Sequence, residues 1–560
     1  MADVLCDMSL YDQKTSMQIT HDLWAKFFPF KEPRNEQIDA INFALNAYLN
    51  DKKKFVVLEL GTGVGKSAIG VAIARFLNSL DRVNGDAYIL TTQKLLQDQY
   101  MTDFGVGIDP LVSIKSSSNY TCGYYKEQSC GESRRLLTTL KKHFSDTAFA
   151  SSCSSKKCVY AVEKSNFMNA SLGITNYSYF LAETMYAKKL TPRGLLIIDE
   201  AHNTEAELAK FISIVFSTKF ANDVLNVKRP NQDDDDIIFK WVKQKYKPAL
   251  TKHIKTLLST IESMNENSDM DKFSELSKKY ESLDKHICKV NRFIDGYDKK
   301  NWIMNVSAYE SGKNNKKYEF KPIDLSNDSD ETLFKFGERV LMLSATIVDN
   351  DVFCRSLGIK KQDVAYMRAA SPFDVENKPI HYMPVGSMSK NNIEQTLPIM
   401  TEAIKMLLEQ HADDKGIIHC VSFKVANHIV QNLRSNRLLI HDSINREEIL
   451  KLHLSSKEPT VLISPSMSEG VNLADDASRF QIICKVPFPY LGDVMVKKKM
   501  ERDSKWYVYM TAKTVIQSLG RSIRSENDHA ISYILDSDWD LFFTKNSSMF
   551  PEDFVASIKK

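Results

Sequence analysis

Short apolar runs alternate with helical patterns over the first hundred residues of the chain. Residues 55–60 (FVVLEL) and 87–92 (AYILTT) are apolar-rich stretches of strand length, and residues 67–80 between them predict a helix. A strand, a helix and a second strand joined by a Gly-rich connection are typical of a parallel α/β sheet. We therefore expect an α/β domain, interrupted at 116–160 by a Ser-, Cys- and Lys-rich insertion and resumed by a strand at 195–199.

The pattern changes between residues 203 and 325. Two long stretches there place apolar residues three to four positions apart between charged ones, which predicts amphipathic helices. The acidic run 233–236 predicts an exposed turn or a helix start, and residues 301–325 predict a β-hairpin with its turn at GKNN. We interpret this region as a mostly helical insertion, after which the first sheet resumes at 340–346.

A second α/β pattern follows residue 370. Apolar strands separated by helical stretches are predicted at 416–422, 460–466, 480–486 and 531–536. The predicted fold class is therefore α/β, with two such domains, of which the first carries two insertions. The length of 560 residues is compatible with this number of parts.

The composition is that of an ordinary folded chain. Hydrophobic residues make up 43% and charged residues 26%, which excludes a disordered chain, a collagen-like chain and a small disulfide scaffold. No uncharged apolar run approaches the roughly 18–20 residues of a membrane span, and the N-terminal segment has no apolar core of a secretory signal. Nine cysteines then predict reduced thiols or a metal site. We expect a cytoplasmic protein and no membrane partner.

The net charge becomes informative only when it is mapped along the chain. The 74 Lys and Arg against 71 Asp and Glu give a formal charge of +3. Residues 121–160 alone hold seven basic and three acidic residues, a balance of +4. Concentrated positive charge attracts a phosphate backbone. A solvated surface also carries such runs, so both interpretations stay open from charge alone.

A phosphate-binding loop is predicted at GTGVGKS, between the first strand and the following helix. Its glycines let backbone N–H groups face a nucleotide phosphate, and the helix adds the positive end of its dipole. Lys66 is expected to reach the β- and γ-phosphates, and Ser67 to bind Mg²⁺. Leucine stands at position 60, where the full pattern has glycine. The nucleotide-binding residues expected in this loop are Gly61, Thr62, Gly63, Gly65, Lys66 and Ser67.

A strand that ends in carboxylates supplies the other half of a hydrolytic site. LLIIDEAH places Asp199 and Glu200 directly after four apolar residues, and paired carboxylates at the end of a buried strand need a cation to offset them. We expect Asp199 to hold Mg²⁺, and Glu200 to orient and deprotonate the attacking water. His202 has two interpretations, a site residue and a hydrogen-bonded core histidine. Together with the loop, this motif predicts nucleotide hydrolysis.

Two arginines near the end of the chain are candidates for the same reaction. Gln517, Arg521 and Arg524 lie at helical spacing, so the two guanidinium groups are able to face one direction. Guanidinium groups opposite a triphosphate stabilise the charge that develops during phosphoryl transfer, and exposed solubilising arginines are the alternative. We assign all three residues to catalysis and expect the nucleotide in a cleft between two domains.

Four cysteines in the 116–160 insertion indicate a metal centre. Cys122, Cys130, Cys153 and Cys158 are separated by 7, 22 and 4 residues, and no C-x-x-C pair occurs among them. Thiolates at irregular spacing are able to hold an iron–sulfur cluster when loops bring them together. Zinc and free thiols remain alternatives from spacing alone. The other cysteines lie mostly in apolar runs and are expected in the core.

These motifs resemble the superfamily-two helicases, and among them the XPD/DinG-like iron–sulfur DNA helicases. GTGVGKS and DEAH resemble motifs I and II of the family. In EPRNEQ, Arg34 and Gln37 match the adenine-side motif. The remaining matches are TTQKLLQDQ (91–99) with the strand-contacting motif Ia, LSAT (343–346) with the coupling motif III, SPF (371–373), SEGVNL (468–473) and QSLGRSIR (517–524). In SEGVNL, Asn472 stands where the family usually has Asp.

The resemblance implies two RecA-like parallel-sheet motor domains that bind ATP and Mg²⁺, with a 4Fe-4S cluster on the four cysteines. It also implies a helical arch that forms a pore for single-stranded DNA together with the cluster insertion. The parts expected on this basis are motor domain 1 at 1–115, 161–204 and 326–365, the iron–sulfur insertion at 116–160, the arch at 205–325 and motor domain 2 at 366–560.

The function implied is an ATP-dependent DNA helicase that translocates on single-stranded DNA, 5′→3′ in the family, and unwinds duplexes. Single-stranded and forked DNA are the expected partners, and a monomer the expected state. A DEAH-type RNA helicase is one alternative, and the four cysteines argue against it. A nucleotide-gated DNA-binding subunit without unwinding activity is another, and the intact Lys66, Glu200, Arg521 and Arg524 argue against that.

Overall fold

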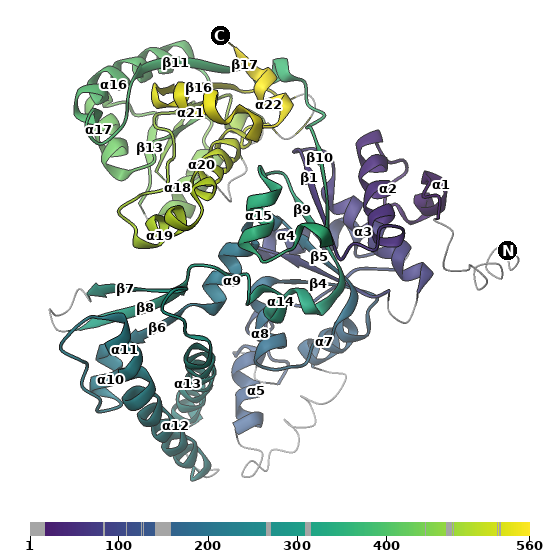
Figure 1. The fold of residues 1–560 in the computed structure, drawn as a ribbon, viewed down its shortest axis with the longest axis vertical. Coiled ribbons are helices and arrows are strands. Elements are labelled where there is room, and N and C mark those ends of the chain that lie inside the picture. The colour runs from purple at the N-terminus through teal and green to yellow at the C-terminus, as the bar shows by residue number, and fades with distance from the viewer. Residues whose placement is uncertain are drawn as a thin grey trace, which may run out of the picture. The chain divides into compact units, whose positions relative to one another are not determined.

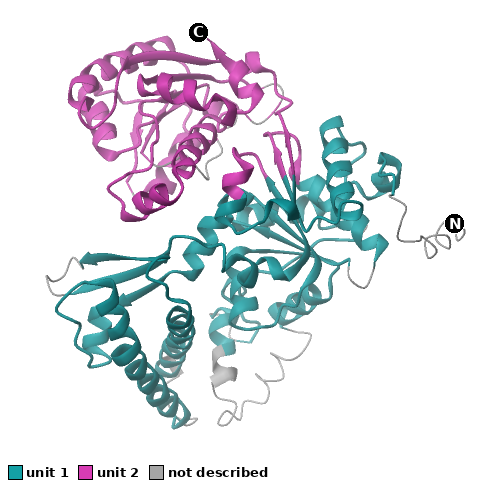
Figure 2. Cartoon of the chain, viewed as in Figure 1, with its two compact units in different colours: residues 1–57, 67–343, 354–365 teal, residues 58–66, 344–353, 366–560 magenta. Residues whose placement is uncertain are grey.

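The chain folds into α/β parts with one accessory group of helices (Figure 1). Residues described in the computed structural model are 17–81, 85–107, 109–124, 126, 128–139, 158–264, 270–308, 315–442, 444–465, 473, 475–523, 525 and 528–559. Two compact units are distinguished in Figure 2. Unit 1 comprises Met1–Val57, Ser67–Leu343 and Cys354–Ala365, and unit 2 comprises Leu58–Lys66, Ser344–Phe353 and Tyr366–Lys560.

The first sheet has seven strands among the described residues, in the order β10-β1-β9-β5-β2-β4-β3. The pairs β2–β4, β3–β4, β2–β5 and β5–β9 run parallel. All six residues of β1 are buried. Such complete burial is expected of a parallel strand that helices cover on both faces. The strands are β1 (Phe55–Leu60), β2 (Ala87–Thr91), β3 (Val112–Ser113), β4 (Leu172–Asn176), β5 (Arg193–Asp199), β9 (Gly337–Ser344) and β10 (Val364–Ala369).

Helices connect these strands, as the apolar periodicity predicts. The longest of them, α2 and α3, bury apolar stripes of alanine, isoleucine and leucine. The helices are α1 (His21–Trp24), α2 (Asn35–Leu49), α3 (Lys66–Leu80), α4 (Lys94–Phe104), α5 (Cys130–Thr139), α7 (Val159–Asn169), α8 (Tyr177–Met185), α9 (Thr204–Ile212), α14 (Ser329–Thr332) and α15 (Asn350–Ser356).

Residues 214–322 form the accessory group, at the lower left of Figure 1. Their strands form an antiparallel sheet in the order β6-β8-β7, which confirms the strand pairing of the predicted hairpin; residues 312–314 of its predicted turn lie outside the described residues. An aromatic core holds the sheet on its helices, with the rings of Phe293 and Phe320 4.7 Å apart. The elements are β6 (Ile214–Ser217), α10 (Thr218–Asp223), α11 (Asp235–Trp241), α12 (Lys247–Glu262), α13 (Met270–Gly296), β7 (Trp302–Ala308) and β8 (Lys316–Pro322).

The acidic run begins a helix, which is one of the two structures expected for it, the other being an exposed turn. Asp234 is the N-cap of α11, and its carboxylate accepts hydrogen bonds from the backbone N–H groups of Asp236 and Ile237. Aspartate at this position satisfies N–H groups that have no partner inside the helix and also faces the positive end of the helix dipole.

The second sheet lies in unit 2 and is parallel throughout its described strands. Its order is β13-β14-β12-β15-β16-β11-β17, so the second predicted α/β pattern is confirmed. The strands are β11 (Ile380–Gly386), β12 (Gly416–His419), β13 (Leu438–Ile440), β14 (Val461–Ser464), β15 (Phe480–Ile483), β16 (Ile531–Asp536) and β17 (Ile558–Lys559).

Helices cover both faces of this sheet. On one face Met400 and Ile429 pack with Ile418 of β12, and on the other Val515 packs with Ile534 of β16. The helices are α16 (Ile393–Gln410), α17 (Phe423–Leu433), α18 (Arg446–Ser455), α19 (Val494–Arg502), α20 (Ser504–Leu519), α21 (Asp538–Asn546) and α22 (Glu552–Ser557). Within the described part of the chain, no helix is long and apolar enough to cross a membrane.

The expected burial of the cysteines outside the insertion is correct for three and wrong for one. Cys354, Cys420 and Cys484 are buried, whereas Cys288 is exposed on α13. The apolar neighbours of Cys288 belong to an amphipathic helix, and its own position lies on the helix face turned to solvent. Cys6 lies outside the described residues.

Candidate functional site

The predicted phosphate loop joins the end of β1 at Leu60 to the start of α3 at Lys66. Gly63 and Gly65 have φ angles of +88° and +83°, in the left-handed region that glycine adopts without steric cost. The loop therefore has the curled backbone that turns N–H groups toward a phosphate, directly before a helix N-terminus. The Lys66 ammonium lies 3.4 Å from the carbonyl oxygen of Leu60, to which it donates.

The segment after β10 holds this loop in place. The Gly61 N–H donates to the Ala369 carbonyl at 3.1 Å, and the Ser371 hydroxyl donates to the Thr62 carbonyl at 2.9 Å. A Cβ atom on Gly63 would lie 2.2 Å from the ring of Phe373. The SPF segment is thus a packing partner of the phosphate loop, a relation that its sequence does not reveal.

A buried carboxylate lies on the strand that leads into the loop. Glu59 is 2% exposed and accepts hydrogen bonds from the N–H groups of Ile347 at 3.0 Å and Val348 at 2.8 Å. Its other oxygen accepts from Nε of Arg368 at 2.7 Å and from the hydroxyl of Tyr366. Four donors therefore satisfy one charge that has been removed from water.

This carboxylate stabilises an unusual backbone. Val348 has a φ of +67°, which costs a β-branched residue about 1–3 kcal/mol, and Arg368 also donates to its carbonyl. Burial disfavours the charge of Arg368, but the adjacent Glu59 carboxylate raises the pKa of Arg368. Burial and the same carboxylate raise the pKa of Tyr366, which therefore stays a hydrogen-bond donor.

The turn fixed by Glu59 follows directly on the predicted coupling motif LSAT. Thr346 accepts a hydrogen bond from the side-chain amide of Gln517 at 3.1 Å, so two motifs 171 residues apart meet. Gln517 lies on α20, which ends at Leu519. The helical spacing expected of Gln517, Arg521 and Arg524 is not continued past Leu519, because the helix stops at Gly520, whose N–H caps the Ile516 carbonyl. Arg521 follows the helix end, and Arg524 lies outside the described residues.

The two residues predicted to bind magnesium share a neighbour. Tyr100 is buried directly after the predicted motif Ia and donates to Asp199 Oδ2 at 3.0 Å, and the nearby Ser67 side chain acts to lower the pKa of Tyr100. Burial, and then the charge of Asp199, raise the pKa of Tyr100 far above its usual range. Ser67 and Asp199 therefore lie within reach of one phenol. Tyr100 immediately follows TTQKLLQDQ and is not among the site residues that the motifs predict.

The predicted general base lies just beyond β5. Glu200 has a φ of +51°, in the left-handed region, and its N–H donates to Asp199 Oδ1 at 3.0 Å. Its Oε2 is 3.3 Å from Nδ1 of His202. The left-handed backbone at Glu200 ends β5 directly after Asp199.

The predicted adenine-side residues lie at the start of α2. The side-chain oxygen of Gln37 accepts a hydrogen bond from the Arg34 backbone N–H at 2.9 Å. This bond is half of a capping box, and it satisfies an N–H group at the beginning of the helix. The structure therefore gives Gln37 a local role in starting α2, in addition to the predicted role toward a base.

Two of the four insertion cysteines lie on a short hairpin. Thr121 and Ser129 form an antiparallel bridge, which brings together the flanking Cys122 and Cys130, 7% and 3% exposed. Cys158 is the N-cap of α7, and Cys153 lies outside the described residues. Among the residues that the structure does describe, no three Cys, His, Asp or Glu side chains are gathered closely enough to hold a metal ion.

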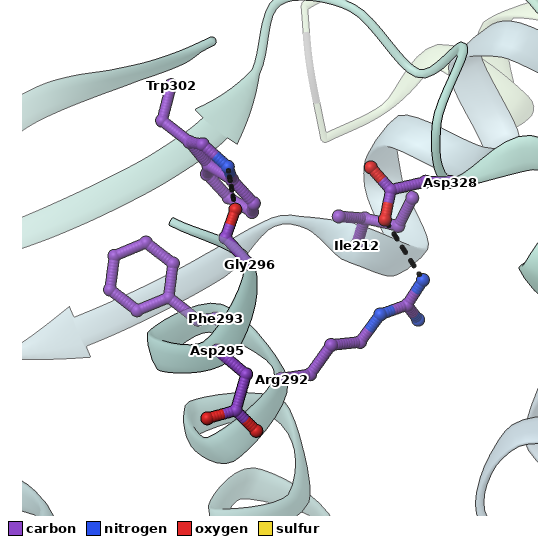
Figure 3. Close-up of a pocket in the computed structure, with 7 residues that line it drawn as sticks. All are labelled: Ile212, Arg292, Phe293, Asp295, Gly296, Trp302 and Asp328. Carbon is purple, nitrogen blue, oxygen red and sulfur yellow. Dashed lines mark hydrogen bonds and ion pairs between the residues drawn. The ribbon is translucent and has the colours of Figure 1, made fainter. Parts of the chain in front are cut away.

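A separate cavity of about 510 Å³ lies at the base of the accessory group (Figure 3). Arg292 and Asp328 form an ion pair across it at 3.5 Å, and the indole N–H of Trp302 donates to the Gly296 carbonyl at 3.3 Å. None of the predicted site residues lines it. Its lining consists of Ile212, Arg292, Phe293, Asp295, Gly296, Trp302 and Asp328.

Comparisons with known families and proteins agree with this geometry. Residues 30–228 match the family described as type III restriction enzyme, res subunit, and residues 405–551 match the helicase C-terminal domain family. The ATP-dependent DNA helicase CHL1 of Scheffersomyces stipitis is 25% identical over 27% of this chain and 24% of its own length. The ATP-dependent DNA helicase DinG of Photobacterium profundum is 26% identical over 38% of this chain and 34% of its own.

The match to CHL1 thus spans about a quarter, and the match to DinG about a third, of the length of that relative. The ATP-dependent DNA helicase YoaA of Escherichia coli matches along most of both chains, at 21% identity over 91% of this chain and 92% of the relative. Among solved structures, one described as XPD helicase has a TM-score of 0.60 at 15% identity, covering 93% of this chain and 98% of that one. Xpd4 of S. tokodaii has a TM-score of 0.57 at 14% identity, over 94% and 99%. These likenesses show a fold with two RecA-like parallel-sheet domains.

Proposed function

We infer that the chain is an XPD/DinG-like superfamily-two helicase, which hydrolyses ATP to translocate along single-stranded DNA and unwind duplexes. The observation that carries this proposal is that Tyr100 hydrogen-bonds Asp199 and that the Ser67 side chain lies near enough to Tyr100 to influence its pKa. This arrangement brings together the hydroxyl that follows the phosphate loop and the carboxylate at the end of β5, which are the two protein ligands that an ATP-bound Mg²⁺ requires. The similarity to DNA helicases along most of the chain supports the same function.

Each residue of the site has a distinct task in this proposal. Backbone N–H groups of the loop and the Lys66 ammonium bind the phosphates, while Ser67 and Asp199 hold Mg²⁺, which neutralises charge on the β- and γ-phosphates. Glu200 accepts the proton of the attacking water. Gln517 links this chemistry to the turn after Thr346 through its amide. Arg521 and Arg524 are proposed to offset the charge that develops on the transferred phosphate.

Lys66→Ala is expected to abolish strand separation while DNA binding is retained. Removing one preorganised charge from the reacting phosphates costs at least about a hundredfold in rate. The measurement is strand separation on forked, 5′-tailed and 3′-tailed duplexes, in parallel with DNA binding without nucleotide. A wild-type protein that binds DNA and does not unwind it is a nucleotide-gated subunit. ATPase stimulation by RNA but not by DNA identifies an RNA helicase instead.

We also propose that Cys122, Cys130, Cys153 and Cys158 hold a 4Fe-4S cluster and that residues 205–325 form an arch. The buried hairpin thiols supply the ligand type that such a cluster requires, and when bound the cluster cross-links a segment with little apolar core.

Helix α13 of the arch contacts α5, which begins at Cys130. This contact supports a pore for single-stranded DNA between the two insertions. Forked DNA and a monomeric state complete the proposal.

Cys122→Ser is expected to remove iron and visible absorbance from the anaerobically purified protein and to abolish unwinding, with ATP binding retained. The matched control is Cys288→Ser, because Cys288 is an exposed cysteine on α13, outside the cysteine-rich insertion at 116–160. Iron content and the absorbance spectrum are measured for both variants before any assay of activity. A wild-type protein that contains stoichiometric zinc, or no metal, contradicts the cluster.

A further inference from the structure

In one stretch of the accessory group, lysine is the only kind of charged residue among Lys, Arg, Asp and Glu. Residues 237–261 contain six lysines and neither aspartate nor glutamate. The stretch covers most of α11 and α12 and the π-helical turn Val242–Tyr246 between them. Pro248 has no N–H to donate to the Gln244 carbonyl, which accounts for the wider turn at this point. Such π-turns occur frequently at functional sites.

Two lysines of α12, and Lys245 in the π-helical turn before it, lie opposite the buried face of α12. Leu250, Ile254, Leu257 and Ile261 are buried, and α12 packs against α13. Lys245, Lys252 and Lys255 are exposed and project from the other side of the helix, since they lie seven and three positions apart. At about 1.5 Å per residue these three ammonium groups extend over about 15 Å. We call them the α12 lysine face.

The charge of this face is not neutralised by its surroundings. Among the described residues, none of the three lysines forms an ion pair with a carboxylate. The nearby acidic run is already engaged, because Asp233 pairs with Lys316 and Asp236 with Lys299. Helix α13 differs, since its basic residues alternate with Asp271, Glu275, Glu281, Asp284 and Asp295. The positive charge is therefore concentrated on α12.

The chemistry of the face selects its ligand. Unpaired ammonium groups spaced along a helix fit a polyanion with regularly spaced charges. Single-strand binding surfaces add aromatic rings on which bases stack, whereas Trp241 and Tyr246 are buried and Phe239 is stacked on Tyr297 at 4.1 Å. Duplex DNA keeps its bases inside and presents phosphates alone, so a lysine-only face suits a duplex.

We propose that the α12 lysine face binds the phosphate backbone of duplex DNA, a site distinct from the ATP site and from the path of the single strand. The inference rests on the proposed function as a DNA helicase, because it assigns the unseparated part of the substrate to the arch. Binding there holds the duplex without reading its sequence, since ammonium groups contact phosphates alone.

The test compares two triple variants of the full-length protein. Lys245→Gln, Lys252→Gln and Lys255→Gln together remove the face. Lys278→Gln, Lys279→Gln and Lys285→Gln remove the same charge from exposed positions of α13. Binding of a blunt duplex and of a single strand is measured by fluorescence anisotropy without nucleotide, at several salt concentrations. ATPase stimulation by the single strand is measured separately and reports the proposed function by itself.

The first variant is expected to weaken duplex binding about tenfold or more. The slope of log K against log salt should become shallower by about three, one for each lost phosphate contact. Single-strand binding and single-strand-stimulated ATPase should change less than twofold, and the α13 variant should match the wild type. Unchanged duplex binding, equal losses for duplex and single strand, or equal losses in both variants overturn the proposal. A wild type without DNA-stimulated ATPase refutes the proposed function instead.

Discussion

Glu200→Gln is expected to lower the rate of DNA-stimulated ATP hydrolysis by about 10²–10⁴-fold, the range of a lost general base. The amide cannot accept the proton of the attacking water, whereas the proposed phosphate loop and the proposed magnesium ligands remain intact. Affinity for ATP should therefore change less than about threefold. Phosphate release with single-stranded DNA gives the rate, and a fluorescent ATP analogue gives the affinity.

The control for this variant is Glu205→Gln, which removes a carboxylate from the first turn of α9, five residues along the chain. It should hydrolyse ATP at close to the wild-type rate, because Glu205 lies outside the loop and the end of β5. Normal turnover in Glu200→Gln would place the base at another residue. His202, 3.3 Å from Glu200, is then the first candidate to replace.

Glu59→Ala is expected to destabilise the protein by about 3–5 kcal/mol, the cost of removing one partner from a buried ion pair. The change leaves the guanidinium of Arg368 and the N–H groups of Ile347 and Val348 without their acceptor. It also releases the left-handed turn at Val348. Urea unfolding followed by circular dichroism measures the loss.

Glu338→Ala is the matched control for Glu59→Ala. Glu338 is an exposed carboxylate on β9, in the sheet to which β1 contributes, and its removal should cost no more than about 0.5 kcal/mol. A Glu59→Ala protein as stable as this control would mean that water replaces the lost acceptor. The Glu59 network would then have no structural importance.

The sheets and the phosphate loop were predictable because their determinants are local. Apolar-rich runs such as residues 55–60 indicate strands buried on both faces, and the glycines before Lys66 permit the left-handed backbone of a phosphate loop. The acidic helix start at Asp234 and the hairpin of β7 and β8 followed from equally short patterns.

The parts that escaped prediction depend on distant residues. Glu59 is a lone carboxylate in an apolar run, and its partners lie 288 and 309 positions away. Tyr100 reaches Asp199 across 99 residues. The spacing of Gln517 and Arg521 is compatible with a helix, and only the break at Gly520 shows that Arg521 lies beyond it. Local periodicity contains no information about such long-range partners.

The bonds between the phosphate loop and the segment after β10 have a mechanical consequence. The Gly61 N–H donates to the Ala369 carbonyl and the Ser371 hydroxyl to the Thr62 carbonyl, and the chain runs from Ala369 and Ser371 to β11 of the second sheet. A displacement of that segment therefore acts directly on the backbone of the proposed phosphate loop.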